Sequence, residues 1–276
     1  MNKTHYGNLL FRFVPFVAKS TFRELQAKLA GVPRYQAGFV SAGRWQLHYL
    51  DAASLLSAFD VVVVKRWNDF RCEKKNPVIL DGGANIGIST IHYKRLFPDA
   101  VITSFEPDLR ACELLRRNLA ANLINDVEIV EKALWTNNSG ASFFSEGADA
   151  SRVMRAGDEV LTSLTPSAKQ FEVETVRLAD YLARTEYDLV KLDIESAEAE
   201  VIPDCGDTLR NVNNLVIEFH LTNSKPRDLA RTLEALANQG FHVSVCSYGP
   251  WIDLLHPPSN TAKVEFDQYL LICAWR

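Results

Sequence analysis

The sequence predicts an α/β protein built on a doubly wound sheet, with a largely helical extension before it. Between residues 77 and 130, short apolar runs alternate with amphipathic stretches in the order strand, helix, strand, helix, strand. Glycines gather where the first of these strands meets its helix. Acidic residues follow several of the strands, at the edge where open α/β sheets bind their ligands.

The composition excludes several classes of protein. The chain has 276 residues, is 47% hydrophobic and carries a net charge of −4. Its apolar content is too high for a mainly disordered chain, and its acidic balance argues against a nucleic-acid partner. The five cysteines are far apart and form no C-x-x-C pair, so we expect free thiols in a reducing compartment.

We expect residues 1–75 to form an N-terminal extension or cap and residues 76–276 the main domain. Leu9 to Ala18 is apolar, but it is shorter than the roughly 20 residues that span a bilayer. It predicts a docking helix, with contact to a membrane surface as the alternative and no stable insertion. The expected location is cytoplasmic.

The extension has three further predicted elements. Helical spacing over Thr21–Ala30 ends at Gly31, and Trp45–Tyr49 alternates like a strand. Ala52–Trp67 is mostly helical in pattern, although its β-branched run Val61–Val64 could be extended.

The main domain is predicted in two halves. The first contains, in order, strand Val78–Leu80 ending at Asp81, helix Ile88–Phe97, strand Ala100–Phe105, helix Asp108–Asn122 and strand Val127–Val130. A hairpin and mobile loop follow over Asn137–Ala168, either as a lid or as an insertion without function. The second half contains, in order, strand Glu172–Leu178, helix Ala179–Ala183, a fourth core strand Tyr187–Glu195, a fifth Leu215–Phe219, helix Arg227–Gln239, and strands Phe241–Ser247 and Gln268–Trp275, which could pair antiparallel at the sheet edge.

The glycine-rich turn, residues 81–87, is the first candidate site. Its sequence DGGANIG lacks the G-x-G-x-x-G spacing of dinucleotide sites and the Lys-Ser/Thr of phosphate loops. An acid at its start would repel a pyrophosphate but suits a ligand with a positive centre or donor groups. The alternative is a plain tight turn.

Glu106 follows the next strand, where a carboxylate can accept both hydrogen bonds of a ribose diol. The alternative is an acid that only precedes the helix starting at Asp108. Together, Asp81, the glycines and Glu106 indicate an adenosine site without phosphates, for which S-adenosylmethionine is the common ligand.

An ordered set of motifs resembles FkbM-type methyltransferases over roughly residues 60–245: VILDGGANIG (78–87), SFEP (104–107), NLAAN (118–122), DLVKLDIESAE (188–198) and IEFH (217–220). The resemblance implies a class I methyltransferase fold, a seven-stranded sheet whose last strand is antiparallel. It also implies S-adenosylmethionine as methyl donor. The acceptor is usually a hydroxyl on a sugar, glycoside or other natural product, such as a polyketide-like molecule.

Carried over residue by residue, the resemblance implies a cofactor loop, a ribose ligand and a turn beside the adenine: Asp81, Gly83, Asn85 and Gly87 for the loop, Glu106 for the ribose and Ala133 in the turn. One departure is visible. The family usually has glycine after the second acid of the fourth-strand motif, where this chain has Ser196.

The fourth and fifth strands carry the candidate catalytic residues. Strand alternation puts Lys191, Asp193 and Glu195 on one side, although a central parallel strand is normally apolar on both faces. Glu218 and His220 share a face of the fifth strand. If the two strands are neighbours, these charges converge at the carboxyl edge and indicate a site.

The chemistry of methyl transfer requires alignment, and an alcohol must also lose its proton. His220, with a reference pKa of about 6.5, is the first candidate base, and Asp193 is the second. The third possibility is a divalent metal held by Asp193, Glu195 or Glu218. These hard oxygen ligands would favour magnesium.

The acceptor pocket is expected between the extension and the 137–168 loop. Its aromatic candidates are Tyr49, Trp67 and Phe70, each with core packing as the alternative. Arg152 and Arg155 could contact an anionic acceptor or simply be solvated.

The sequence thus favours a small-molecule O-methyltransferase. A nicotinamide-dependent oxidoreductase and a methyltransferase fold kept only for binding partners are the alternatives. An RNA or protein acceptor, transfer to nitrogen or carbon, and homo-oligomerisation also stay open.

Overall fold

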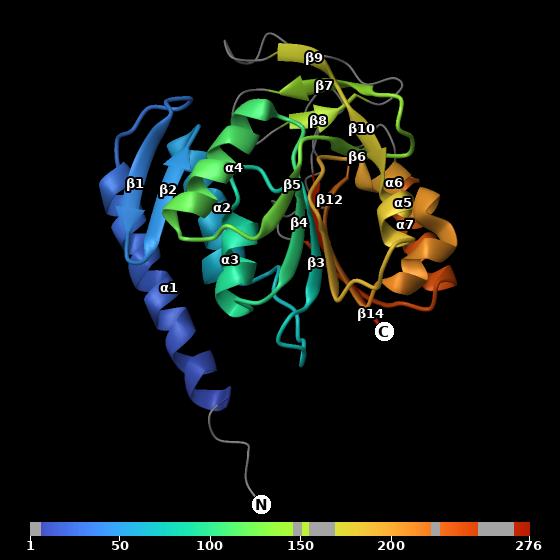
Figure 1. The fold of residues 1–276 in the computed structure, drawn as a ribbon, viewed down its shortest axis with the longest axis horizontal. Helices are drawn as coiled ribbons and strands as arrows, with labels where there is room; N and C mark the ends of the chain where they lie inside the picture. The colour runs from blue at the N-terminus through green and yellow to red at the C-terminus, as the bar shows by residue number, and fades with distance from the viewer. Residues whose placement is uncertain (1–6, 146–150, 155–168, 222–226, 248–267) are drawn as a thin grey trace, which may run out of the picture.

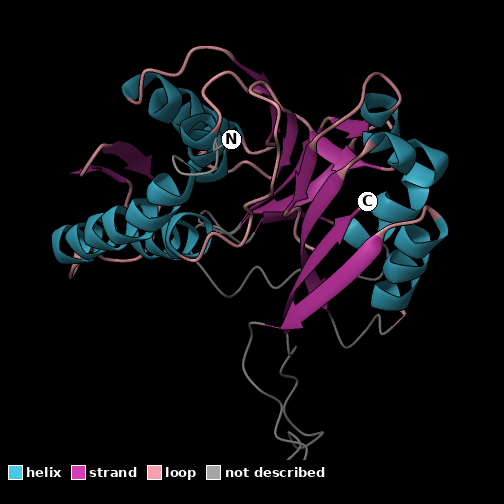
Figure 2. Ribbon diagram, turned by 90° about the horizontal axis from the view of Figure 1, so that it is seen from below, coloured by secondary structure: helices cyan, strands magenta, loops and turns pink. Residues whose placement is uncertain are grey.

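The computed structural model describes residues 7–145, 151–154, 169–221, 227–247 and 268–276, and of these only the backbone at 7–16, 221 and 268 (Figure 1). A central sheet is covered by helices on both faces, as Figures 1 and 2 show. Doubly wound folds have this arrangement because a parallel sheet must bury both faces.

The central sheet has seven strands in the order β13-β14-β12-β11-β3-β4-β5. Its members are β3 (Val78–Gly82), β4 (Val101–Phe105), β5 (Val127–Val130), β11 (Leu189–Leu192), β12 (Asn214–Leu221), β13 (His242–Ser247) and β14 (Gln268–Trp275). Strand β14 is antiparallel to both of its neighbours, whereas the pairs from β12 to β5 are parallel. The predicted class I fold, with its antiparallel last strand, is confirmed.

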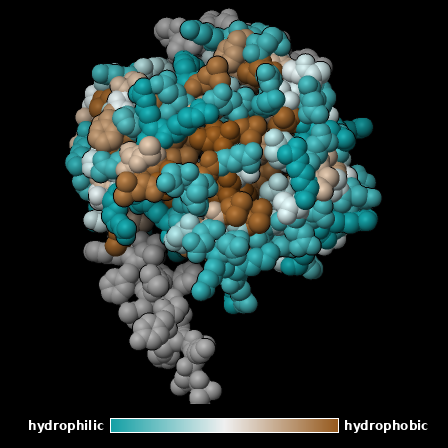
Figure 3. All heavy atoms as spheres, viewed as in Figure 1, coloured by the Kyte–Doolittle hydropathy of each residue, from teal (hydrophilic) through white to brown (hydrophobic). Residues whose placement is uncertain are grey.

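Helices α3 (Ile88–Leu96) and α4 (Leu109–Ala121) lie on one face of the sheet. Three helices lie on the other: α5 (Leu178–Leu182), α6 (Glu198–Cys205) and α7 (Asp228–Asn238). A short 3-10 helix, Gly206–Asn211, follows α6. Figure 3 shows apolar side chains gathered over the middle of one face, surrounded by polar side chains.

The segment after β5 forms two small sheets. Strands β6 (Ala133–Trp135) and β10 (Thr175–Arg177) pair in parallel. The other sheet has the order β8-β7-β9, from β7 (Ala141–Ser145), β8 (Ser151–Val153) and β9 (Lys169–Val173). The predicted hairpin is therefore present, but the strand predicted over Glu172–Leu178 is divided between the two sheets. Most of the predicted loop lies outside the described residues.

The extension contains one strand that the sequence did not predict. Its elements are α1 (Gly7–Leu29), β1 (Gly38–Ala42), β2 (Trp45–Tyr49), α2 (Ala52–Phe59) and a π-helix, Asp60–Val64. Strand β1 pairs with β2 as an antiparallel hairpin. The β-branched run stays helical, but with the wider π geometry, and the Lys65 N–H donates to the Asp60 carbonyl at 2.8 Å. Among the described residues, no helix combines the length and apolar character needed to cross a bilayer.

Two asparagines, one in α4 and one directly after it, bind the backbone of β2. The Asn118 side chain accepts from the His48 N–H (2.6 Å) and donates to the His48 carbonyl (3.0 Å). Asn122 does the same with Gln46, at 3.4 and 2.8 Å. Four helical residues rise about 6 Å and two strand residues about 6.8 Å, so the spacings match. The N-L-x-x-N motif thus attaches the extension to the main domain.

The same interface is sealed by a shared apolar core. Leu25, Leu47 and Phe59 of the extension are buried in one cluster with Ile88 of α3 and Leu115 of α4. The Asn118 amide also donates to the Ile86 carbonyl at 2.8 Å. The extension is therefore anchored directly beside the glycine-rich turn.

Candidate functional site

Asp81 ends up beneath the glycine-rich turn rather than in a pocket wall. It is fully buried, and its Oδ2 accepts from the Ser89 and Thr90 hydroxyls at 2.6 and 2.7 Å. Both partners belong to the first turn of α3, so Asp81 ties the end of β3 to that helix. The observed contacts give Asp81 a supporting role, and the contact with cofactor that the sequence predicts stays a prediction.

Gly83 allows the turn to approach the end of β11. Its φ is +70°, and a Cβ added there would lie 1.8 Å from the Asp193 carbonyl oxygen. The N–H groups of Gly83 and Ala84 both donate to the Phe105 carbonyl at 3.0 Å. Only glycine fits this position. Gly87 also has a positive φ, +91°, but it caps α3 and does not line the pockets described below.

Glu106 is buried at the end of β4, and each of its carboxylate oxygens accepts a backbone N–H. Asn85 donates to Oε2 and Asp108 to Oε1, both at 2.9 Å. Burial raises the pKa of Glu106 to about 7, although these two N–H groups oppose the shift. A carboxylate offers about four acceptor positions, so capacity remains for two further donors such as a diol.

A first pocket lies between the glycine-rich turn, the end of β4 and the β6 segment. Four of the six residues predicted to bind the cofactor line it, namely Gly83, Asn85, Glu106 and Ala133. Its apolar walls include Phe105, Leu134, Phe143 and Val153. The pocket therefore places a buried acid beside apolar walls, and the adenosine site that the sequence predicts here stays a prediction.

A second pocket lies between the extension and the carboxyl ends of β11 and β12. All four predicted catalytic residues line it: Lys191, Asp193, Glu218 and His220. Strands β11 and β12 are parallel neighbours, which is why these side chains meet. The two pockets share Gly83, Asn85, Asp193 and Glu195, so they adjoin there.

Of the three predicted aromatic residues, Trp67 lines the second pocket and the other two do not. Tyr49 is buried in the core of the extension, and Phe70 packs against Tyr93 and Phe97. Of the two predicted arginines, Arg152 stacks over the Phe144 ring at 5.9 Å, and Arg155 lies outside the described residues.

Lys191 holds the glycine-rich turn. It is 4% exposed, and its Nζ donates to the carbonyls of Gly82 (3.1 Å) and Gly83 (2.8 Å). Burial works against the ammonium, but the carboxylates of Asp193 and Asp81 outweigh it and raise the pKa of Lys191. Lys191 is therefore a charged residue that holds the turn, and its catalytic role stays a prediction.

The fourth core strand is shorter than predicted. Strand β11 ends at Leu192, and Glu195 and Ser196 have φ values of +56° and +75°. Strand alternation therefore does not extend to Glu195, and a tight turn brings it to the site instead. The left-handed conformation at Ser196 explains why glycine is favoured at this position.

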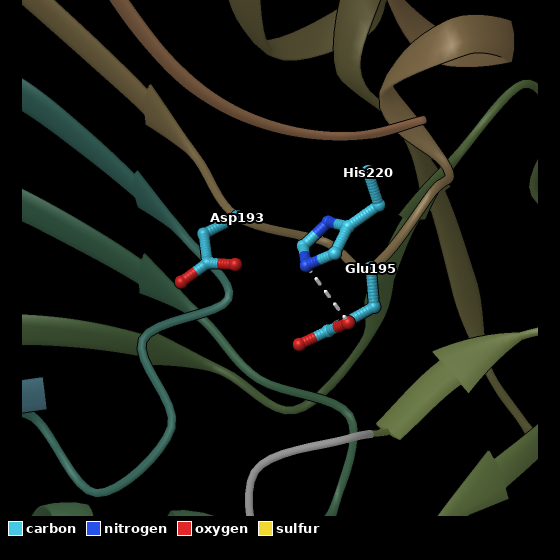
Figure 4. A group of neighbouring side chains, drawn as sticks. All are labelled: Asp193, Glu195 and His220. Carbon is cyan, nitrogen blue, oxygen red and sulfur yellow. Dashed lines mark ion pairs between the residues drawn. The ribbon is translucent and has the colours of Figure 1, made fainter. Parts of the chain in front are cut away.

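His220 contacts Glu195 across this turn (Figure 4). Its Nε2 lies 3.2 Å from Glu195 Oε2, and its ring packs edge-on against Tyr269, with centroids 5.0 Å apart. One donor atom each from Asp193, Glu195 and His220 lie within 4.8 Å of one another. The predicted metal set contained Glu218; among the described residues, His220 takes that place.

Glu198, the first residue of α6, lies behind this cluster. It is fully buried, and its Oε1 accepts the Ile194 N–H at 2.7 Å. Burial raises the pKa of Glu198 to about 7, while the nearby His220 opposes the shift. Neither Glu198 Oε2 nor His220 Nδ1 has a hydrogen-bond partner among the described residues.

Tyr269 is a pocket residue that sequence reasoning missed. It lines the second pocket because β14 runs antiparallel to β12 with Tyr269 opposite His220. The pairing of these strands can be guessed from sequence, but their register cannot. The loop residues that line the pocket in the extension, including Arg34 and Asn68, carry no motif that would have identified them.

Comparison with known proteins finds a family model and relatives that are all named as methyltransferases. The family model described as methyltransferase FkbM domain matches residues 81–243. Methyltransferase 1 of Beauveria bassiana is 27% identical over 184 residues, covering 60% of this chain and 73% of that protein. The 2-O-methyltransferase NoeI of Sinorhizobium fredii is 28% identical over 166 residues, covering 53% and 65%.

Among solved structures, a methyltransferase FkbM from Methylobacillus flagellatus aligns with a TM-score of 0.47 and 14% identity, covering 91% of this chain and 58% of that chain. The family match itself spans more than half of the 276 residues. It also contains the glycine-rich turn, Glu106 and the whole Asp193–Glu195–His220 cluster. The chain therefore belongs to the FkbM methyltransferase family.

Proposed function

We propose that this methyltransferase uses S-adenosylmethionine to methylate a hydroxyl group on a small molecule, such as a sugar, a glycoside or another natural product. The observation that carries the proposal is the junction of the two pockets at Gly83, Asn85, Asp193 and Glu195. A pocket with a buried acid and apolar walls that adjoins a second, polar pocket suits a transfer between two substrates.

The first pocket would hold the cofactor. Glu106 would accept the ribose hydroxyls, and the apolar walls near Ala133 would cover the adenine. Gly83 keeps the turn close to β11, and Lys191 fixes it there through two carbonyl groups. When bound, S-adenosylmethionine supplies a methyl group already activated by its sulfonium charge, so positioning provides much of the rate.

The second pocket would hold the acceptor. Its wall combines the Trp67 ring with the carboxylates of Asp193, Glu195 and Glu218. Aromatic faces and carboxylate acceptors together suit polyhydroxylated rings. The relative whose name states 2-O-methylation supports a hydroxyl as the acceptor group.

The acceptor hydroxyl must lose its proton at the junction. Of the two bases that the sequence predicts, Asp193 would accept it, because its carboxylate is partly exposed in the pocket, whereas His220 Nε2 already contacts Glu195 Oε2 at 3.2 Å. Magnesium, the other cofactor that the sequence suggests, would need Asp193 and Glu195 as oxygen ligands. The extension would cap the acceptor pocket, because residues of α2 and the π-helix line it.

Calorimetric titration tests the cofactor. We expect S-adenosylhomocysteine to bind the purified chain with a roughly micromolar Kd and NADH not to bind. Glu106→Ala should weaken the first affinity at least tenfold, because it removes the carboxylate that would accept the ribose hydroxyls. Binding of NADH alone would overturn the proposal in favour of an oxidoreductase.

Transfer of a radiolabelled methyl group to a panel of sugars, glycosides and polyketide-like alcohols tests the acceptor. Label should appear on oxygen, and methylation of a matched amine but not of the alcohol would contradict the proposed acceptor group. The same assay with tRNA and protein substrates is the control for a macromolecular acceptor.

A further inference from the structure

We propose that Asp193, Glu195 and His220 form a binding site for one divalent cation at the junction of the two pockets. This inference deepens the proposed methyltransferase function, because the cation would lie where the acceptor binds. It differs from the set of oxygen ligands that the sequence suggests, since an imidazole replaces the Glu218 carboxylate.

The donor atoms have the spacing of a ligand set. Metal–ligand bonds of about 2.1 Å place neighbouring ligands about 3 Å apart and opposite ligands about 4.2 Å apart. The three donors already lie within 4.8 Å of one another. Asp193 and Glu195 are partly exposed, with side chains 30% and 26% accessible, so small rotations can bring them onto one ion.

The imidazole is fixed in the orientation that a ligand needs. His220 is 8% exposed and packs edge-on against Tyr269, so the ring has little room to turn. Figure 4 shows its Nε2 facing the space that the two carboxylates also face. Buried Glu198 lies near enough for its charge to interact with His220, but its Oε1 accepts the Ile194 N–H and does not bond the imidazole.

The same orientation argues against His220 as a simple base. Its Nε2 is 3.2 Å from Glu195 Oε2, so the nitrogen facing the pocket is already occupied by a carboxylate. The other nitrogen, Nδ1, is buried, so it cannot reach the hydroxyl of an acceptor molecule in the pocket. A cation bound here would instead be ligated by His220 Nε2 and the Glu195 carboxylate together.

The charge around the junction also calls for a cation. The carboxylates of Asp193, Glu195 and Glu218 line the pocket together with Lys191, whereas Arg34 and Lys65, which also line it, pair with Asp51 and Asp60. The Lys191 ammonium directs its hydrogens to the Gly82 and Gly83 carbonyls and lies 3.5 Å from Asp193 Oδ2. Mixed carboxylate and imidazole ligands fit Mn²⁺ better than Ca²⁺. A bound cation lowers the pKa of a hydroxyl that it contacts.

Metal binding can be measured without cofactor, acceptor or activity. The full chain is treated with a chelator, dialysed and titrated with Mn²⁺, with free Mn²⁺ followed by electron paramagnetic resonance. We expect one Mn²⁺ per chain and, in pulsed spectra, modulation from a directly bound imidazole nitrogen. Binding without nitrogen modulation in the unmodified protein would overturn the ligand assignment, whatever the variants do.

The variants are chosen to separate the possible ligand sets. His220→Ala and Asp193→Asn should each weaken Mn²⁺ binding at least tenfold, and His220→Ala should remove the nitrogen modulation. His242→Ala, which removes an exposed histidine on β13, is the matched control and should bind like the unmodified chain. Circular dichroism checks that each variant is folded.

Two further results would overturn the proposal. The first is Mn²⁺ binding that survives His220→Ala but is lost in Glu218→Gln, which would indicate the oxygen-only set. The second is absence of saturable binding. Titration of the same metal-free protein with S-adenosylhomocysteine measures cofactor binding independently of the metal. Absence of this binding would contradict the proposed function but would not change the result on Mn²⁺.

Discussion

At the scale of single residues, the site depends on close backbone contacts and on one buried acid. Gly83 and the Asp193 carbonyl meet where two loops from separate strands cross. Glu106 is buried at the neighbouring strand end, with both oxygens already bound to N–H groups. These contacts hold the first pocket in shape before any ligand enters it, and each can be tested by a substitution.

Gly83→Ala should be strongly destabilising. The new Cβ would overlap the Asp193 carbonyl at 1.8 Å, which adds backbone displacement to the cost of a positive φ. We expect a loss of at least about 2 kcal/mol in urea unfolding. Gly31→Ala is the matched control, since Gly31 has a φ of +78° but nothing within 4 Å. It should cost about 1 kcal/mol, and equal losses would show that steric overlap is unimportant.

The pKa of Glu106 predicts a pH dependence of nucleoside binding. Burial raises this pKa to about 7, and ribose hydroxyls donate to the charged carboxylate, so ligand binds the deprotonated form. Affinity should therefore rise with pH, by about tenfold between pH 6 and pH 8. Calorimetry with 5′-methylthioadenosine, which has the ribose but no amino-acid group, measures this. Glu106→Gln should bind the ligand weakly and with an affinity that does not change with pH. A pH dependence that persists in this variant would belong to another titrating group.

At the scale of elements, the pairing of α4 with β2 is the main device that attaches the extension. A helix seldom continues a strand ladder, because its own backbone groups are occupied. Here Asn118 and Asn122 supply side-chain amides in place of a backbone, at matching spacing. The motif that contributed to the family resemblance therefore has a structural role.

Asn118→Ala should loosen the extension. Asn118 is fully buried, and its removal leaves the His48 N–H and the carbonyls of His48 and Ile86 without their partner. We expect a loss of about 2–4 kcal/mol in urea unfolding and faster proteolysis between α1 and β2. Asn122→Ala, at a partly exposed position, should cost clearly less. The reverse order would contradict this account.

At the scale of the whole molecule, the extension and the main domain share a core. Leu47 and Phe59 pack in the same cluster as Ile91 and Leu119. Segments that share a core unfold together, so the described part of the extension, residues 7–75, is expected to lose its structure with the sheet. This coupling also means that the wall of the acceptor pocket depends on the stability of the extension.

Phe59→Ala tests this coupling. Phe59 is fully buried and packs edge-on against Trp45 at 4.9 Å between centroids. Truncation should cost about 3–5 kcal/mol. Hydrogen exchange followed by mass spectrometry should then show faster exchange in peptides from β2 and from β3 alike. Faster exchange confined to the extension would mean that the two parts unfold separately.

The sequence by itself determined the fold class, because strand and helix periodicity and the turn at residues 81–87 are local features. It also identified the candidate residues, since acids and a histidine at the ends of buried strands are unusual in any fold.

Only the tertiary structure decided which of these residues meet. The position of Glu195 follows from a left-handed turn, and the contact of His220 with Tyr269 follows from strand register. The burial of Asp81 and the contacts of Lys191 depend on α3 and on the Gly82 and Gly83 carbonyls at the end of β3. Such contacts join residues distant in sequence, and their geometry is fixed by packing, which local patterns do not encode.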